Sequence, residues 1–162
     1  MEGVQFTLGL GLAALGAGLA MGVAAIGSGI GVGIAGAAGA GVIAEDSKKF
    51  GPVLILQAFP QTQGIYGFVT AVLILMGVGL LGGEIKPISM ELGLICLSAG
   101  IASALGGLTA IGQGMTAGAA MGSVAKNPAT LGQNMVLSVM SETFAVFALL
   151  IAILILVGAG IM

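Results

Sequence analysis

The fold is decided by residues 144–157, which read FAVFALLIAILILV. They lie inside a longer apolar run, residues 132–162, that contains one acidic residue, Glu142, and no basic residue. A helix of about 20 apolar residues crosses the hydrocarbon core of a bilayer. We therefore expect this run to form a membrane-spanning helix.

Three earlier runs have the same character, and they cover residues 4–44, 52–81 and 92–125. Short polar breaks separate them, such as Glu45–Lys49 and Lys126–Pro128. Hydrophobic residues make up 58% of the chain and charged residues 6%, whereas soluble domains carry about 25% charged residues. The sequence predicts an all-α membrane protein with four transmembrane helices.

The composition excludes several classes of function. The four basic residues are all Lys and are scattered, so there is no basic patch for nucleic acid. There is no His, and Cys96 is the single Cys. This excludes the usual zinc sites and Cys–His catalytic pairs. We expect Cys96 to be a small core residue.

The two halves of the chain repeat with a shift of 81 positions. Gly31 matches Gly112 and Thr62 matches Thr143, and residues 73–75, LIL, match residues 154–156 without a gap. We therefore expect two tandem hairpins of the same orientation, residues 1–81 with helices 4–44 and 52–81, and residues 82–162 with helices 92–125 and 132–162. The same shift places Gln61 opposite Glu142 (61 + 81 = 142).

The lysines predict the orientation. Lys48, Lys49 and Lys126 lie in the first and third breaks, whereas Lys86 alone lies in the second. The positive-inside rule puts the first and third loops in the cytoplasm and both termini outside. The expected location is the cell membrane, with several passes and with lipid around the helices.

Glu142 is the strongest candidate for a functional residue. It stands ten positions after Gly132, which is about 15 Å into a hydrocarbon core of about 30 Å. A carboxylate at this depth costs several kcal/mol, so it either stays protonated or binds a cation. A permanently neutral structural acid is the simpler reading, but a Gln would serve that purpose equally well.

The second run carries an unusual group of polar residues around Pro60, and the third run adds Gln113. Pro60 leaves the carbonyl of Leu56 without its helical partner. Each polar side chain alone is explained by an interhelical hydrogen bond. Several neutral oxygens beside one carboxylate suit a hard cation, whereas a proton site needs only the carboxyl group. The residues of this group are Gln57, Gln61, Thr62, Gln63 and Tyr66.

The first run is rich in Gly, and several of its glycines, including Gly29 and Gly33, are four positions apart. That spacing suits close packing of membrane helices. We expect this helix where space is tight, as on the inner wall of a ring.

Two motifs resemble those of a known family. Residues 54–68 read LILQAFPQTQGIYGF and residues 140–145 read MSETFA. Together with the repeated hairpins, they resemble the proteolipid, the K or c subunit, of V-type and archaeal A-type rotary ATPases, of the sodium-translocating kind. The resemblance covers the whole chain.

The resemblance implies a homo-oligomeric rotor ring that carries an ion past a stator subunit of the a or I type, which has an essential Arg. It also implies central-stalk subunits and a soluble head that hydrolyses or makes ATP, so this chain is not an enzyme on its own. Na⁺ would be bound by Glu142, Thr62, Gln63, Gln113 and the backbone carbonyl of Phe59.

In the same family pattern, a Tyr matching Tyr66 hydrogen-bonds the carboxylate. Gln61 stands where a small residue is usual, which makes it a candidate extra contact. We expect Na⁺ as the ion and H⁺ as the alternative. One carboxyl group per four helices means few ions per turn, which favours an ATP-driven pump. A pore or a secondary transporter that uses Glu142 as a pathway acid is the competing class.

Overall fold

The computed structural model describes residues 7–82, 84–85 and 87–162, and within these ranges all regular structure is helical. Four helical stretches are long and apolar enough to cross a membrane: Leu8–Glu45, Ser47–Gly77, Met90–Lys126 and Pro128–Gly158. This confirms the predicted fold class. The start of the first predicted run, residues 4–6, and Lys86 lie outside the described residues.

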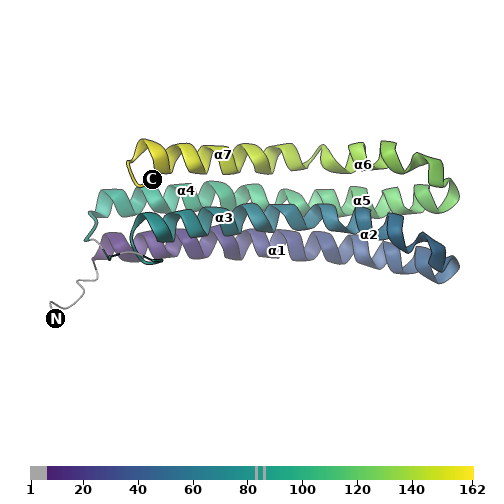
Figure 1. Ribbon diagram of the computed structural model, residues 1–162, viewed down its shortest axis with the longest axis horizontal. Coiled ribbons are helices and arrows are strands. Elements are labelled where there is room, and N and C mark those ends of the chain that lie inside the picture. The colour runs from purple at the N-terminus through teal and green to yellow at the C-terminus, as the bar shows by residue number, and fades with distance from the viewer. Residues whose placement is uncertain (1–6, 83, 86) are drawn as a thin grey trace.

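Each stretch is one rod of the fold. The first is α1 (Leu8–Glu45), and the second joins α2 (Phe50–Ala58) to α3 (Thr62–Gly77) through a 3₁₀ turn at Phe59–Gln61. The third joins α4 (Met90–Gly107) to α5 (Thr109–Lys126), and the fourth joins α6 (Leu131–Val139) to α7 (Glu142–Gly158). The rods lie side by side along one direction (Figure 1).

The loops that carry the predicted cytoplasmic lysines lie at one end of the bundle. The first residues of α1 and the C-terminus lie at the other end (Figure 1). Lys49 Nζ donates a 2.7 Å hydrogen bond to the carbonyl of Ala125, which ties these two loops together. The repeat extends into the loops. Asp46 and Asn127, 81 positions apart, each accept a bond from the backbone N–H two residues later.

Glycines bring α1 against α4 and α5. A Cβ at Gly114 would collide with the backbone of Gly31, and one at Gly100 would collide with the backbone of Gly16. Lipid tails are as apolar as these helices, so close backbone contact rather than hydrophobic burial drives such packing. The Gly-rich sequence of α1 is therefore used for helix contact.

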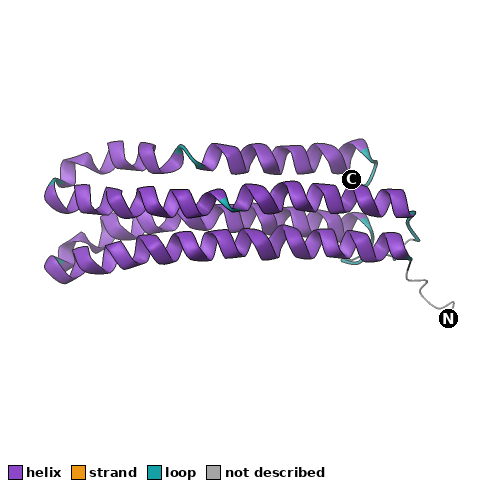
Figure 2. Cartoon of the chain, turned by 180° about the vertical axis from the view of Figure 1, so that it is seen from behind, coloured by secondary structure: helices purple, strands orange, loops and turns teal. Residues whose placement is uncertain are grey.

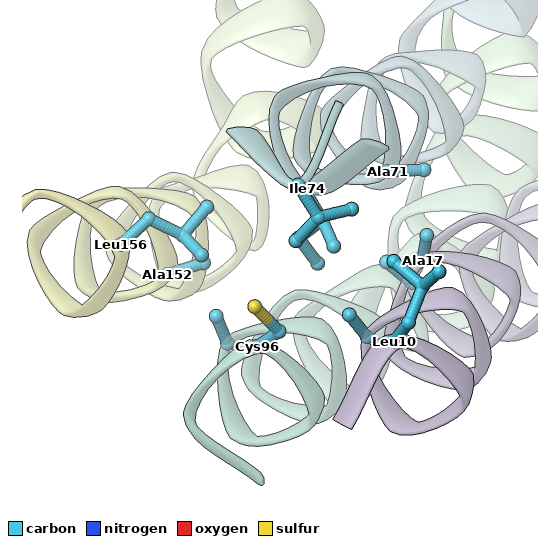
Figure 3. Packing of buried hydrophobic residues seen from close by; sticks show 11 residues of the cluster. Leu10, Ala17, Ala71, Ile74, Cys96, Ala152 and Leu156 are labelled. Carbon is cyan, nitrogen blue, oxygen red and sulfur yellow. The ribbon is translucent and has the colours of Figure 1, made fainter. Parts of the chain in front are cut away.

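Two apolar clusters fill the bundle. One lies towards the termini and contains Leu10, Ile74, Cys96 and Leu156, and Figure 3 shows their side chains meeting between α1, α3, α4 and α7. The burial predicted for Cys96 is confirmed. The other cluster lies towards the loops and includes Leu56 and Met121. Between the clusters lie buried polar side chains, which divide the apolar core into two parts.

The second and fourth rods break at equivalent positions. In the second rod the break is the 3₁₀ turn that contains Pro60, and in the fourth it is Met140–Ser141, which lie between α6 and α7. The break in the fourth rod is visible in Figure 2 as a loop inside the helix. The second break has no Pro, and it places Glu142 at the start of α7.

Candidate ion-binding site

Glu142 is the first residue of α7, and its side chain is half-buried. The helix break thus puts the carboxyl group at a helix N-terminus, where the unpaired backbone N–H groups favour negative charge. Among the described residues the one ion pair is Lys49–Asp46, at the loop end of the bundle. No basic side chain of the described chain therefore pairs with Glu142.

Two neutral side chains hold the carboxyl group. Tyr66 of α3 donates its hydroxyl hydrogen to Glu142 Oε1 at 2.5 Å, and Gln113 Nε2 of α5 donates to Oε2 at 3.4 Å. Glu142 is therefore held by both hairpins, and each carboxylate oxygen has a donor.

The hydrogen bonds continue from Gln113 into the break of the second rod. Gln63 Nε2 donates to Gln113 Oε1, and both side chains are fully buried. Thr62 Oγ1 lies 2.9 Å from the carbonyl oxygen of Phe59 and 3.3 Å from Gln63 Oε1. One continuous network thus joins all six residues that the family pattern named.

The carbonyl of Phe59 lies in the 3₁₀ turn that contains Pro60. A helical carbonyl is normally paired with the N–H four residues later, but here Phe59 starts a 3₁₀ turn and accepts from the backbone N–H and the hydroxyl of Thr62. A carbonyl oxygen has two lone pairs, so it can contact a cation once the Thr62 hydroxyl turns its hydrogen away. The Pro-containing turn thus places a backbone oxygen beside Thr62 in the network.

The donor set defines what the site can hold. It offers one carboxylate and the neutral oxygens of two amides, one hydroxyl and one backbone carbonyl, which are ligands for a hard cation. No cluster of three or more His, Cys, Asp or Glu occurs in the described part of the chain. A single carboxylate neutralises one positive charge, so a monovalent cation leaves the site without net charge inside the membrane.

Gln61, the candidate extra contact, does not join this network. Its side chain is exposed and lines a cleft between α1 and α3, together with Ser28 and Phe68. It therefore points away from Glu142, on the other side of α3 from Gln63.

The structure also uses polar residues for which the sequence alone predicts no role. Thr70 Oγ1 lies 2.9 Å from Ser103 Oγ and joins α3 to α4, and Ser28 Oγ accepts a 2.8 Å bond from the backbone N–H of Gly64. The buried hydroxyl of Ser141 has no partner among the described residues. Single Ser and Thr residues in apolar runs carry little signal, since their hydroxyls often bond within their own helix.

Comparison with known proteins supports a family assignment. The family of ATP synthase C subunits matches residues 15–74 and again residues 97–155, so the same family pattern covers each hairpin. The chain belongs to this ATP synthase C-subunit family. Its two matches are what the 81-residue repeat predicts.

Two relatives are similar to the chain over most of its length. It is 52% identical to the A-type ATP synthase subunit K of Methanocaldococcus jannaschii, over 91% of this chain and 62% of that protein. It is 36% identical to the V-type sodium ATPase subunit K of Enterococcus hirae, over 76% of each chain. The matched region thus spans less than two thirds of the length of the first relative.

Proposed function

We propose that this chain is a rotor-ring subunit of an A/V-type rotary ATPase and carries Na⁺ across the membrane on Glu142. The observation that supports this most directly is the network of neutral oxygens that converges on one carboxyl group between two apolar clusters. In this proposal the ligands are Glu142, Thr62, Gln63, Gln113 and the Phe59 carbonyl. Tyr66 holds the carboxylate in place.

The charge of Glu142 explains how the binding of Na⁺ controls the rotation of the ring. With Na⁺ bound, Glu142 is neutralised, and the subunit passes through lipid at low cost. Without the ion, a carboxylate facing lipid costs several kcal/mol, so the empty form persists only beside a cation. The Arg of an a- or I-type stator subunit supplies that cation in our proposal.

The proposal also includes the other subunits of the rotary ATPase. Copies of this chain form a homo-oligomeric ring, the central-stalk subunits connect the ring to the soluble head, and ATP is hydrolysed or made there. The end of the bundle with Lys48, Lys49 and Lys126 lies in the cytoplasm, with both termini outside. The sodium ATPase relative supports the choice of ion by its name.

A proton is the second candidate ion. A protonated Glu142 that bonds Tyr66 and Gln113 is also neutral, but it uses neither the hydroxyl of Thr62 nor the Phe59 carbonyl. These additional oxygens favour Na⁺. A pore or secondary transporter that uses Glu142 as a pathway acid is the remaining alternative, and a purified ring that conducts ions by itself would support it.

Labelling by a carbodiimide separates the two ions. The reagent modifies a protonated, accessible carboxyl group, so bound Na⁺ should slow the labelling of Glu142 at neutral pH, while K⁺ at the same ionic strength should not. The Glu142→Gln variant gives the background. Labelling that is equally fast with and without Na⁺ would remove sodium from the proposal and leave H⁺.

A further inference from the structure

Two buried hydroxyl groups lie between α3 and α4, beside the backbone of Tyr66. Thr70 is fully buried, and Ser103 is 3% exposed. Their hydroxyl oxygens are 2.9 Å apart, and they lie 3.1 Å and 3.5 Å from the carbonyl oxygen of Tyr66. Both residues therefore contact a member of the ion-binding network through its backbone, not through its side chain.

The two hydroxyls together keep a donor on this carbonyl. Thr70 has one hydroxyl hydrogen, which points either to the carbonyl of Tyr66 or to Ser103 Oγ. In the second case, the hydrogen of Ser103 is available to the same carbonyl. Since a helical carbonyl also accepts the N–H four residues later, both lone pairs of the Tyr66 oxygen are used. This turn of α3 is thus tied to α4.

The same part of α4 also packs against α7 next to Glu142. Gly106 follows Ser103 by about one helical turn. A Cβ added at Gly106 would collide with α7 and would lie 3.5 Å from Cα of Ala145, which is one turn after Glu142. Adjacent turns of α4 therefore hold the backbone on both sides of the hydrogen bond between Tyr66 and Glu142.

The internal repeat does not reproduce the hydroxyl pair. A shift of 81 positions converts Thr70 into Ile151 and Ser103 into Gly22 (70 + 81 = 151; 103 − 81 = 22). Neither counterpart has a hydroxyl, so the shared hairpin pattern does not require one at these positions. Burial of a hydroxyl costs free energy unless it is bonded. The pair therefore accompanies the contact between Tyr66 and Glu142, and it is not a general device for packing the hairpins.

We propose that Thr70 and Ser103 are positioning residues of the ion site. Through the carbonyl of Tyr66, they fix the turn of α3 from which the Tyr66 hydroxyl reaches Glu142. An O–H···O bond keeps its strength only within a narrow range of distance and angle, so a small displacement of this turn loosens the carboxyl group. The inference rests on the proposed function for the role of Glu142, but not for the choice between Na⁺ and H⁺.

Two substitutions at Thr70 separate positioning from packing. Thr70→Val removes the hydroxyl and keeps a branched side chain, whereas Thr70→Ser keeps the hydroxyl and removes a methyl group. We expect Thr70→Val to raise the Kd for Na⁺ by about three- to tenfold, the effect of one neutral hydrogen bond, and Thr70→Ser to leave it unchanged. Equilibrium dialysis of the purified assembly measures the Kd, and circular dichroism measures the unfolding temperature.

A second variant and a control accompany this pair. Ser103→Ala removes the other hydroxyl, and we expect it to raise the Kd in the same direction. The double variant Thr70→Val/Ser103→Ala should be weaker by less than the product of the two single effects, because the hydroxyls act together. Thr116→Val is the matched control. Thr116 of α5 bonds the carbonyl of Gly112 four residues earlier, but it is exposed and lies outside the network.

The rate of carbodiimide labelling of Glu142 without Na⁺ keeps the outcomes apart. We expect faster labelling in Thr70→Val than in Thr70→Ser, because Tyr66 then holds the carboxyl group less firmly. If the unmodified protein binds no Na⁺ but Thr70→Val still speeds labelling, the sodium assignment fails and the positioning role stands. Equal Kd values and labelling rates in both Thr70 variants would overturn this inference and leave the sodium assignment intact. A lower unfolding temperature in both, with unchanged Na⁺ binding, would show that the pair serves packing alone.

Discussion

The hydroxyl of Tyr66 donates a hydrogen bond to Glu142 Oε1, across 76 positions of the sequence. Tyr66 belongs to the first hairpin and Glu142 to the second, so this bond crosses the junction between the repeats. It also fixes the one acidic side chain of the membrane interior in a defined orientation. The carboxyl group is thus held in one orientation instead of being free to rotate.

Replacement of Tyr66 by Phe removes this bond and keeps the aromatic side chain. Hydrogen bonds to charged groups contribute about 1.5–3 kcal/mol, so we expect the Kd for Na⁺ to rise by about tenfold or more. Isothermal titration of the purified protein measures it. Thr143→Val, which removes an exposed hydroxyl next to Glu142, is the control and should leave the Kd unchanged. Equal affinities for Tyr66→Phe and the unmodified protein would show that the bond does not support ion binding.

The two buried amides should be needed for the ion but not for assembly. Gln63→Ala and Gln113→Ala each remove an oxygen donor and leave a buried polar partner unsatisfied, so we expect Na⁺ affinity to fall at least tenfold, since such a loss costs about 1–3 kcal/mol. Gln57→Ala is the matched control, because Gln57 is a half-buried amide of α2 outside the network. Unchanged sodium binding in both variants would remove these residues from the site.

A carboxyl group at position 61 should not create a second ion site. Gln61→Glu places an acid at the repeat equivalent of Glu142, but Val32, Phe144 and Phe147 occupy the positions of the other site residues. We expect the number of Na⁺ bound per chain, measured by equilibrium dialysis, to stay the same as in the unmodified protein. A doubled number would show that a carboxyl group alone is enough to create an ion site at this position.

The glycine contact between α1 and α5 should control stability. Gly31→Leu places a side chain against the carbonyl of Ala110 and the ring of Pro60, and such overpacking costs about 1–3 kcal/mol. We expect a lower unfolding temperature in detergent, followed by circular dichroism. Gly132→Leu is the control, because a Cβ there and at its repeat equivalent, Gly51, meets no atom within 4 Å. A loss of stability of the same size in both variants would show that the close contact is not the cause.

Much of this architecture could be predicted because the membrane imposes strong limits. Long apolar runs form spanning helices, and a lone intramembrane acid such as Glu142 is conspicuous. The three-residue spacing of Gln63 and Tyr66 placed them on one face of a helix, and both belong to the network that contains Glu142.

Other features depend on tertiary packing and left no local signal. The break at Met140–Ser141 contains neither Pro nor Gly, so nothing in these residues predicts the end of a helix there. Ser28 gains its role only because Gly64 of another helix lies beside it. The position of Gln61 in the cleft likewise follows from the way the hairpins pack.

Direct binding of radioactive Na⁺ to the purified assembly tests the central claim. We predict saturable binding of one Na⁺ per chain at neutral pH, no displacement by K⁺, and complete loss in a Glu142→Gln variant that still forms the same assembly. Absence of saturable Na⁺ binding, or binding that survives Glu142→Gln, would contradict the account.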